Sequence, residues 1–141
     1  MMVVISIIYP CNLGCPYCPY TDSNSELRRF YKENGGDLLP EALWNKMADE
    51  CGEYGAWMRC TGGGEPMLHH RMVDMVEYAK ARGARIWLNT NGSMFGPTPK
   101  LREKLRRLIA AGIDLIEFSM DAADAATYAR LRPPHGGAPR H

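Results

Sequence analysis

Apolar residues in this chain fall into four short runs, and each run is followed by a longer stretch of helical or loop character. The runs cover residues 3–9, 56–60, 84–88 and 113–118. Short apolar runs bounded by turn residues are typical of buried strands, whereas apolar residues at three- and four-residue steps are typical of amphipathic helices. Strands that alternate with helices predict a parallel sheet wound in one sense, because βαβ crossovers are almost always right-handed.

The stretches that follow the runs predict three helices with one apolar face each. The first begins at Pro40 and ends near Gly55, the second begins near Leu68 and ends near Gly83, and the third ends near Gly112. The three glycines lie 28 and 29 residues apart, the length of one βα unit. The apolar faces are Leu43, Trp44, Met47 and Cys51 in the first helix, Met72, Val73, Val76 and Ala79 in the second, and Leu101, Leu105, Leu108 and Ile109 in the third. Residues 20–37 are polar and predict an ordered loop or a short helix.

Polar side chains follow the predicted strands at the points where the strands end. Cys11, Thr61, Thr90 and Ser119 occupy these positions. Parallel strands present their carboxyl ends at one edge of the sheet, where βα barrels gather their catalytic groups. The sequence therefore predicts one mouth formed by these four residues and their neighbours.

The predicted sheet is too small to close on itself. Four βα units cannot complete a barrel of eight strands, and residues 133–141 are too rich in Pro and Gly to supply another strand and helix. We expect residues 133–141 to be a disordered tail or a truncation end. Three explanations are open: the chain is a fragment of a longer protein, a partner chain completes the sheet, or the gene product is truncated. We favour a fragment.

Composition narrows the class of protein. The chain has 141 residues, of which 45% are apolar and 23% charged, with a net charge of +1. These values fit one soluble folding unit, and no basic stripe indicates nucleic acid or a membrane surface as partner. Residues 1–10 contain no Lys or Arg and no small-residue cleavage pattern. We interpret the first apolar run as a buried strand of a cytoplasmic protein, since it is too short to span a bilayer.

Three of the five cysteines lie within eight residues, in the stretch Cys11-Asn-Leu-Gly-Cys15-Pro-Tyr-Cys18. This spacing fits a soft metal centre in a reducing compartment better than a disulfide framework. A cubane iron–sulfur cluster usually takes four thiolates, so three would leave one iron open for a small molecule. Cys51 and Cys60 are expected to be buried in the core.

A non-catalytic metal module is the alternative from another class of protein. It would bind zinc or an iron–sulfur cluster through the three clustered cysteines and one outside ligand. His69 and His70 could complete a Cys₃His zinc site, although we expect them to be surface residues at the start of a helix. This alternative leaves unexplained why the polar motifs described next all fall at equivalent strand ends.

The cysteine stretch resembles the cluster-binding loop of the radical S-adenosylmethionine (SAM) enzymes. The resemblance implies that Cys11, Cys15 and Cys18 are ligands of a [4Fe-4S] cluster whose fourth iron is chelated by the amino and carboxylate groups of SAM. It also implies that the surroundings of Tyr17 receive the adenine.

The stretch Gly62-Gly63-Gly64-Glu65-Pro66 resembles the Gly-Gly-Glu-Pro motif of the same family. The resemblance implies that this loop binds the amino group of SAM. Consecutive glycines also let the backbone approach a ligand closely. The structural alternative is an ordinary loop before a helix, in which the Glu65 carboxylate stabilises the helix N-terminus.

Two later motifs extend the resemblance, which spans Ile5 to Arg132. Asn89-Thr90-Asn91-Gly92 is similar to the family's Thr-Asn-Gly turn, although Asn-Gly is also a common turn dipeptide. Ser119-Met-Asp121 is similar to Ser-x-Asp-Gly, with Ala122 in place of the glycine. In these stretches Asn89, Thr90, Ser119 and Asp121 are the candidate pocket residues.

A final family feature is the ending Tyr-x-x-x-Arg, which residues 128–132 match. The resemblance implies that Arg132 reaches the cluster region or the carboxylate of SAM. Two purely structural alternatives stay open. Asp121 would be an N-cap for a helix over residues 122–131, and Arg132 would be a solvated residue at that helix end.

The resemblance implies a fold and a reaction. Residues 1–132 would be the N-terminal portion of a radical SAM core domain, with about four βα units of a six-unit partial barrel. A reduced cluster would cleave SAM to methionine and a 5′-deoxyadenosyl radical that abstracts hydrogen from an unknown substrate, a small molecule or a peptide. An electron donor such as flavodoxin or ferredoxin is implied, and no catalytic side chain is assigned. A third alternative is an inactive truncated remnant, since an open sheet edge invites aggregation or partner pairing.

Overall fold

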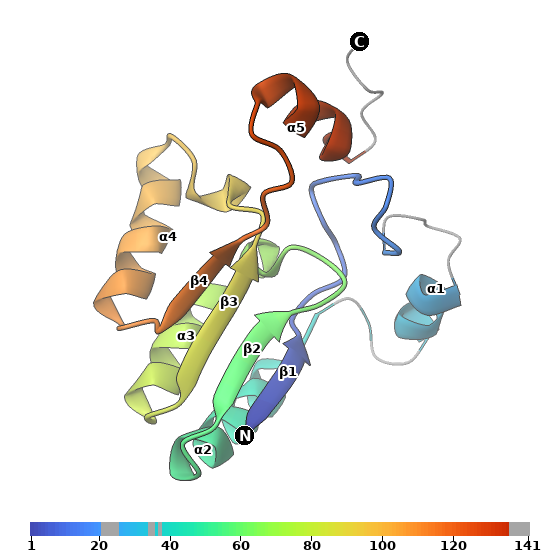
Figure 1. Ribbon diagram of the computed structural model, residues 1–141. Coiled ribbons are helices and arrows are strands. Elements are labelled where there is room, and N and C mark those ends of the chain that lie inside the picture. Colours follow the sequence, from blue (N-terminus) through green and yellow to red (C-terminus); the bar gives the residue numbers. More distant parts are fainter. Residues whose placement is uncertain (21–25, 34–35, 37, 136–141) are drawn as a thin grey trace.

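The computed structural model describes residues 1–20, 26–33, 36 and 38–135. In this part of the chain four parallel strands form one sheet in the order β1-β2-β3-β4 (Figure 1). The strands are β1 (Met2–Ser6), β2 (Trp57–Thr61), β3 (Arg85–Thr90) and β4 (Leu115–Phe118). The helices are α1 (Glu26–Glu33), α2 (Glu41–Glu53), α3 (Met72–Ala81), α4 (Pro99–Ala110) and α5 (Ala125–Leu131), with two short 3₁₀ turns, η1 (Pro66–Leu68) and η2 (Ser93–Phe95). The expected incomplete parallel sheet is confirmed.

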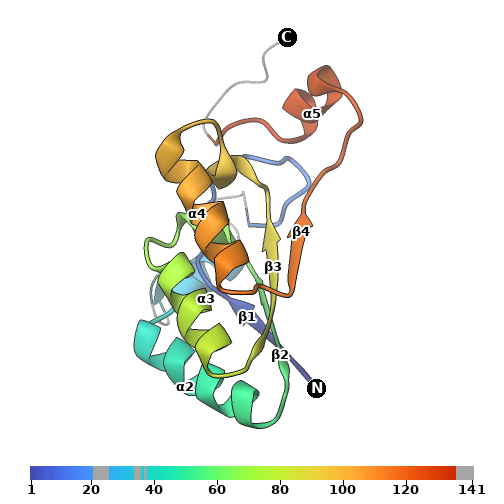
Figure 2. The same ribbon diagram turned by 90° about the vertical axis from the view of Figure 1, so that its left-hand side faces the viewer.

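Helices α2, α3 and α4 cover one face of the sheet and leave the other face open among the described residues (Figure 2). Buried and less buried residues alternate along the strands, because successive side chains point to opposite faces of the sheet and only one face is covered. In β2, Met58 and Cys60 are fully buried under the helices, whereas Arg59 is half-buried on the open face. Register pairs Arg59 with Val4 of β1 and with Trp87 of β3, so these residues share the open face.

The core lies between the sheet and the three helices. Strand residues Ile5, Met58 and Leu88 pack there against Trp44 of α2 and Leu108 of α4. The indole nitrogen of Trp44 donates a hydrogen bond of 2.7 Å to the carbonyl of Met75 in α3, so its polar atom is satisfied inside the core. Cys51 and Cys60 are buried, as expected.

Two residues of the predicted apolar faces are exposed. Leu43 has 47% and Ile109 has 63% of its surface exposed, so these two residues of the predicted faces do not pack into the core. Each precedes or follows a fully buried residue, Trp44 and Leu108 respectively. Neighbouring helical residues are separated by about 100° around the axis, so Leu43 and Ile109 lie at the edge of the apolar face, where packing leaves them exposed.

Helices α2, α3 and α4 end in the same way. Gly55, Gly83 and Gly112 follow them and have φ of +61°, +85° and +77°. This left-handed conformation closes a helix C-terminus and is strained for residues with a Cβ. The repeat of glycines in the sequence therefore corresponds to a repeated helix-to-strand turn.

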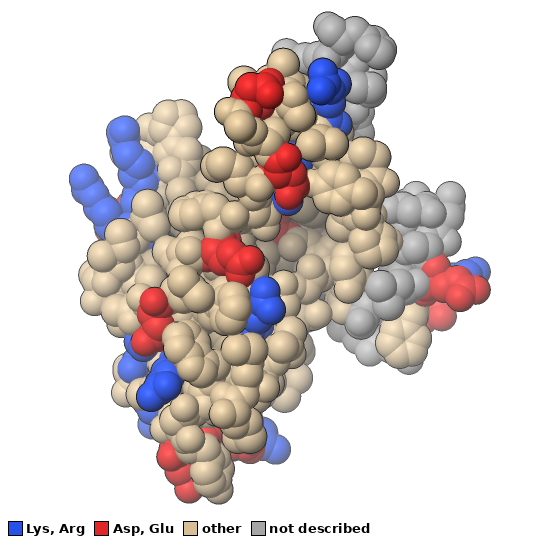
Figure 3. Space-filling view, viewed as in Figure 1, with Lys and Arg blue, Asp and Glu red and all other residues tan. Residues whose placement is uncertain are grey.

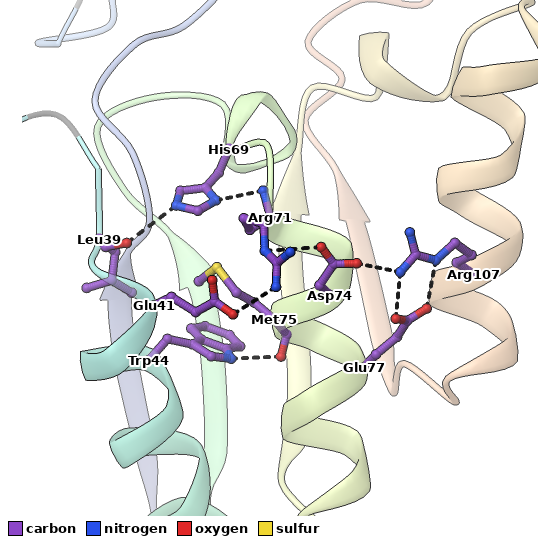
Figure 4. A network of polar contacts seen from close by, with 9 residues as sticks. All are labelled: Leu39, Glu41, Trp44, His69, Arg71, Asp74, Met75, Glu77 and Arg107. Atoms are coloured by element: carbon purple, nitrogen blue, oxygen red, sulfur yellow. Dashed lines mark hydrogen bonds and ion pairs between the residues drawn. The ribbon is translucent and has the colours of Figure 1, made fainter.

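A chain of ion pairs links the outer helices (Figure 4). Arg71 contacts Glu41 at 3.0 Å and Asp74 at 3.3 Å. Arg107 of α4 contacts Asp74 at 2.5 Å and Glu77 at 2.6 Å. Such exposed pairs contribute little individually, and here they align α2, α3 and α4 along the side away from the sheet.

His69 differs from the sequence-based expectation. We expected a surface residue, but only 4% of it is exposed. Its Nδ1 accepts a hydrogen bond of 3.2 Å from the Arg71 backbone N–H, and its Nε2 faces the Leu39 carbonyl at 3.4 Å (Figure 4). The ring reaches inward because the chain turns between η1 and α3. His70 is exposed, as expected.

The open face carries acidic and basic side chains interspersed over the strands (Figure 3).

Within the described residues no helix is long and apolar enough to cross a membrane.

Candidate functional site

A cavity of about 300 Å³ lies at the carboxyl edge of the sheet. Strands β2, β3 and β4 and the loop after β1 deliver side chains to it, as parallel strands with a common edge must. All predicted site residues except Asp121 line this cavity: Cys11, Cys15, Tyr17, Cys18, Gly63, Gly64, Glu65, Pro66, Asn89, Thr90, Ser119 and Arg132. The structure therefore brings together residues of five sequence motifs that are far apart along the chain.

The three clustered cysteines are free thiols on one loop. Cys15 is buried, whereas Cys11 and Cys18 are half-buried. The loop is a compact turn, in which the Cys18 N–H donates to the Cys15 carbonyl at 3.0 Å and the Leu13 N–H donates to Cys11 Sγ at 3.4 Å. Burial raises the pKa of the Cys11 thiol, and the Leu13 N–H opposes that shift.

The donor set fits an iron–sulfur cluster in its chemistry. Three sulfur ligands on one wall of a cavity suit a soft metal centre, and the rest of the cavity leaves room for a further ligand. Among the described residues no three His, Cys, Asp or Glu side chains gather closely enough to hold one metal ion. A cluster makes a different demand from a single ion, because each of its cysteines binds a different iron.

Glu65 is the most buried charged group of the cavity, with 2% of its surface exposed. Its Oε1 accepts hydrogen bonds from the Thr90 hydroxyl at 2.6 Å and from the Met67 N–H at 3.0 Å. Its Oε2 accepts from the Asn91 N–H at 2.7 Å. The carboxylate thereby joins the loop after β2 to the end of β3. It also caps the 3₁₀ turn η1, whereas the helix that was expected near Leu68 begins at Met72 and is not capped by Glu65.

The glycines before Glu65 are required by close packing. A Cβ on Gly64 would lie 2.2 Å from the Pro10 carbonyl oxygen, and one on Gly63 would lie 2.5 Å from the ring of Tyr9. The Glu65 N–H donates to the same Pro10 carbonyl at 3.1 Å. The glycine loop therefore packs directly on the segment that leads into the cysteines.

Asn91 also lines the cavity and was named only as part of a turn motif. Its Nδ2 donates to Oδ1 of Asn12 at 2.9 Å, and Asn12 in turn donates to the Ser93 hydroxyl at 2.8 Å. These bonds tie the turn after β3 to the cysteine loop. The Thr-Asn-Gly motif was the sequence signal, but its commonness as a turn hid the side chain's role.

Asp121 lies beside the cavity rather than in its lining. Its Oδ2 accepts hydrogen bonds from the Tyr17 hydroxyl and from Nε of Arg132. Arg132 first, and Tyr17 second, lower the pKa of this carboxyl. Burial first, and then the bond to Asp121, raise the pKa of Tyr17.

The N-cap of α5 is Asp124, so the alternative that assigned this role to Asp121 was wrong. Asp124 accepts a hydrogen bond of 2.9 Å from the Thr127 N–H. The helix begins later than the sequence suggested, at Ala125. The side chain of Asp121 is therefore available for Tyr17 and Arg132.

Residues 133–135 lie against the cysteine loop. The Gly14 N–H donates to the Pro133 carbonyl at 2.7 Å, and the His135 N–H donates to the Asn12 carbonyl at 2.9 Å. His135 also lines the cavity, as do Tyr9 and Tyr20, and no sequence motif marks any of the three. The remainder of the expected tail, residues 136–141, lies outside the described residues.

Comparisons with known proteins agree with this architecture. The profile of the Radical SAM superfamily matches residues 5–139. A GTP 3′,8-cyclase of Synechococcus sp. (strain CC9902) is 34% identical over 139 residues, which cover 96% of this chain and 36% of the cyclase. A PqqA peptide cyclase of Xanthomonas euvesicatoria pv. vesicatoria (strain 85-10) is 28% identical, over 93% of this chain and 32% of its own length. The chain thus spans about a third of the curated relatives it matches.

Among solved structures, the crystal structure of BtrN in complex with AdoMet and 2-DOIA has the same fold. It aligns with a TM-score of 0.65 and 20% identity, over 87% of this chain and 46% of BtrN. Parallel βα units with a cysteine-lined cavity at their carboxyl edge define an incomplete βα barrel. By the family match, this chain belongs to the radical SAM superfamily, whose enzymes bind a [4Fe-4S] cluster and S-adenosylmethionine.

Proposed function

We propose that this chain is the N-terminal part of a radical SAM enzyme core, in which Cys11, Cys15 and Cys18 hold a [4Fe-4S] cluster. The observation that carries the proposal is the single cavity, which the cysteines share with the glycine loop and the ends of β2, β3 and β4. A cysteine module without a cosubstrate would need only the three cysteines and one further ligand.

When bound, the reduced cluster would supply one electron to the sulfonium of SAM, releasing methionine and a 5′-deoxyadenosyl radical that takes hydrogen from the substrate. The side chains and backbone of this chain bind and orient the two groups. Gly63 and Gly64 let the loop pack directly on Tyr9 and Pro10, which holds Glu65 against the segment that leads into the cysteines. Tyr17 would flank the adenine.

The buried carboxylate of Glu65 supplies negative charge to the cavity wall, which suits the ammonium group of SAM. Its two oxygens already accept three hydrogen bonds within the chain. The ammonium group would therefore meet a carboxylate that the chain's own hydrogen bonds already hold in place. Pro66 restricts the backbone of the turn that follows. Thr90 and Ser119 add hydroxyl groups at neighbouring strand ends.

Arg132 is the cavity's guanidinium, and we assign it to the carboxylate of SAM. Among the described residues Asp121 bonds only its Nε, which leaves its terminal nitrogens for a ligand of the cavity. Asp121 thus acts as a positioning residue for Arg132 and Tyr17.

The proposal includes an unknown substrate, a small molecule or a peptide, because the relatives named above act on both kinds. It also includes a one-electron donor such as flavodoxin or ferredoxin, and a cytoplasmic location in keeping with the free thiols. The rest of the barrel would come from a further part of the protein or from a partner chain, because the chain spans about a third of its relatives.

Iron and sulfide analysis after anaerobic reconstitution tests the ligand assignment. We expect about four irons per chain for the wild type and almost none for Cys15→Ala. Cys51→Ala is the matched control, because this cysteine is buried in α2 away from the loop. Equal iron content in the two variants would contradict the assignment, and zinc in place of iron would favour the non-catalytic module.

A further inference from the structure

The open face of the sheet carries a polar network just below the cavity. Nε of Arg59 in β2 donates a hydrogen bond of 3.0 Å to Oδ1 of Asn89 in β3. A terminal nitrogen of Arg59 lies 3.5 Å from Glu117 in β4, and the guanidinium stacks 4.1 Å from the ring centre of Trp87. The indole of Trp87 donates to Glu117 at 2.8 Å, so each member of the network touches at least one other.

This network fixes the orientation of the Asn89 amide. A guanidinium has only donors, so the amide atom that faces Arg59 must be the acceptor Oδ1. The Nδ2 group is then the opposite end of the amide, and it has no hydrogen-bond partner among the described residues. Asn89 also lines the cavity, whereas Arg59 does not. Because Oδ1 is turned to Arg59, Nδ2 is the amide atom that is left for an occupant of the cavity, and it is a donor.

Arg59 is itself held in place from two sides. Stacking on Trp87 limits the swing of the guanidinium, and Glu117 contacts both Arg59 and Trp87. An arginine fork that is already ordered loses little entropy when it fixes a neighbour. The network is therefore a preorganised support for one side chain at the cavity wall.

We propose that Arg59 is a positioning residue that makes Asn89 a one-way hydrogen-bond donor to an acceptor atom of bound SAM. This inference rests on the proposed function, since it takes SAM as the occupant. It adds a residue outside the cavity to the binding machinery. It also specifies which end of Asn89 meets the ligand.

The variant Asn89→Asp separates an effect on SAM binding from an effect on the stability of the fold. A carboxylate has the same shape and pairs more strongly with Arg59, but it also lies directly across from the Glu117 carboxylate of β4, so the melting temperature should change little. On the cavity side it replaces a donor with an acceptor, so SAM affinity should fall at least about tenfold. A purely structural role for Asn89 would leave the affinity unchanged.

The variant Arg59→Met tests the support. It keeps an unbranched stem on Trp87 but frees the amide to rotate, so SAM affinity should fall about three- to tenfold with unchanged iron content. Arg85→Met is the matched control, because Arg85 lies over Trp57 on the same face, with its guanidinium 5.9 Å from the ring centre. It has no hydrogen bond to Asn89, and it should leave SAM affinity unchanged.

The measurement is equilibrium binding of SAM to the anaerobically reconstituted chain and its variants. The expected order is wild type equal to Arg85→Met, with Arg59→Met and Asn89→Asp weaker. Wild-type affinity in Asn89→Asp, or equal affinities of the two arginine variants, would each overturn the inference. A wild type that assembles its cluster but binds no SAM would instead overturn the proposed function, and this inference with it.

Discussion

The hydroxyl of Tyr17 donates a hydrogen bond to the carboxylate of Asp121, 104 positions further along the chain. The same carboxylate oxygen accepts from Arg132, which follows α5. One oxygen atom therefore holds both the cysteine loop and the segment that closes over it.

Loss of the Asp121 carboxylate should loosen this closure. We expect Asp121→Asn to lower stability by about 1 kcal/mol, because a charge-assisted bond is lost at a partly exposed site. Thiol reagents should then modify Cys15 and Cys18 faster in the cluster-free chain, which can be followed by mass spectrometry. Glu103→Gln, at an exposed pair with Arg106, is the control. Equal modification rates in all three proteins would remove the carboxylate from this role.

The stability that Asp121 contributes should depend on pH in one direction. Its pKa is lowered in the folded chain, so its contribution is fully present above the ordinary carboxyl value and is lost as pH falls through the lowered value. Thermal melts below pH 4 should therefore converge for the wild type and Asp121→Asn, whereas melts at pH 7 should differ. A difference that grows on acidification would contradict the pairing.

The glycine loop should not tolerate a side chain at its third glycine. We expect Gly64→Ala to cost more than about 2 kcal/mol, since its Cβ would lie 2.2 Å and 2.5 Å from two carbonyl oxygens. Gly96→Ala is the matched control, because its Cβ would meet its nearest atom at 3.4 Å. Urea denaturation of both variants measures the difference, and equal stabilities would show that the loop relaxes freely.

Substitution of Glu65 should have two separable effects. The Glu65 carboxylate accepts three hydrogen bonds, and in Glu65→Gln the amide nitrogen would face at least one of these donors, which then lacks an acceptor. We therefore expect a stability loss of about 2 kcal/mol. We also expect cluster content to persist while SAM affinity falls, because the negative charge is gone. Calorimetric titration of the reconstituted protein checks the second effect, and an unchanged affinity would remove Glu65 from the site.

His69 should make the fold sensitive to mild acid. Burial lowers its pKa below the ordinary 6.5, and protonation would cost the bond that Nδ1 accepts from Arg71. Because the unfolded chain then binds more protons, stability is complete above pH 6.5 and declines as pH falls toward the lowered value. Denaturation at pH 8, 7, 6 and 5 should show this slope in the wild type and in His70→Gln. The slope should be much smaller in His69→Gln, and an equal slope there would assign it to another group.

The strands and the mouth were predictable from the sequence because their signals are local. Thr61, Thr90 and Ser119 lie at or directly after strand ends, as the apolar runs predict, whereas β1 ends at Ser6 and Cys11 lies on the loop that follows it. The faces of α2 and α4 were less predictable, since Leu43 and Ile109 are as apolar as their buried neighbours and only packing decides which one turns inward.

Contacts between distant segments could not be predicted in the same way. The bond between Tyr17 and Asp121, and the approach of His135 to the cavity, depend on how α5 and the following residues fold back. The burial of His69 likewise depends on the Leu39 carbonyl, 30 positions earlier in the chain. No periodicity in the sequence marks any of these pairs.

The most direct test of the central claim is an electron paramagnetic resonance spectrum of the anaerobically reconstituted, reduced chain, recorded with and without SAM. The account predicts a [4Fe-4S]⁺ signal whose shape changes when SAM is added, because the three cysteines leave one iron open to it. A cluster signal that ignores SAM, or a chain that assembles no cluster, would contradict it.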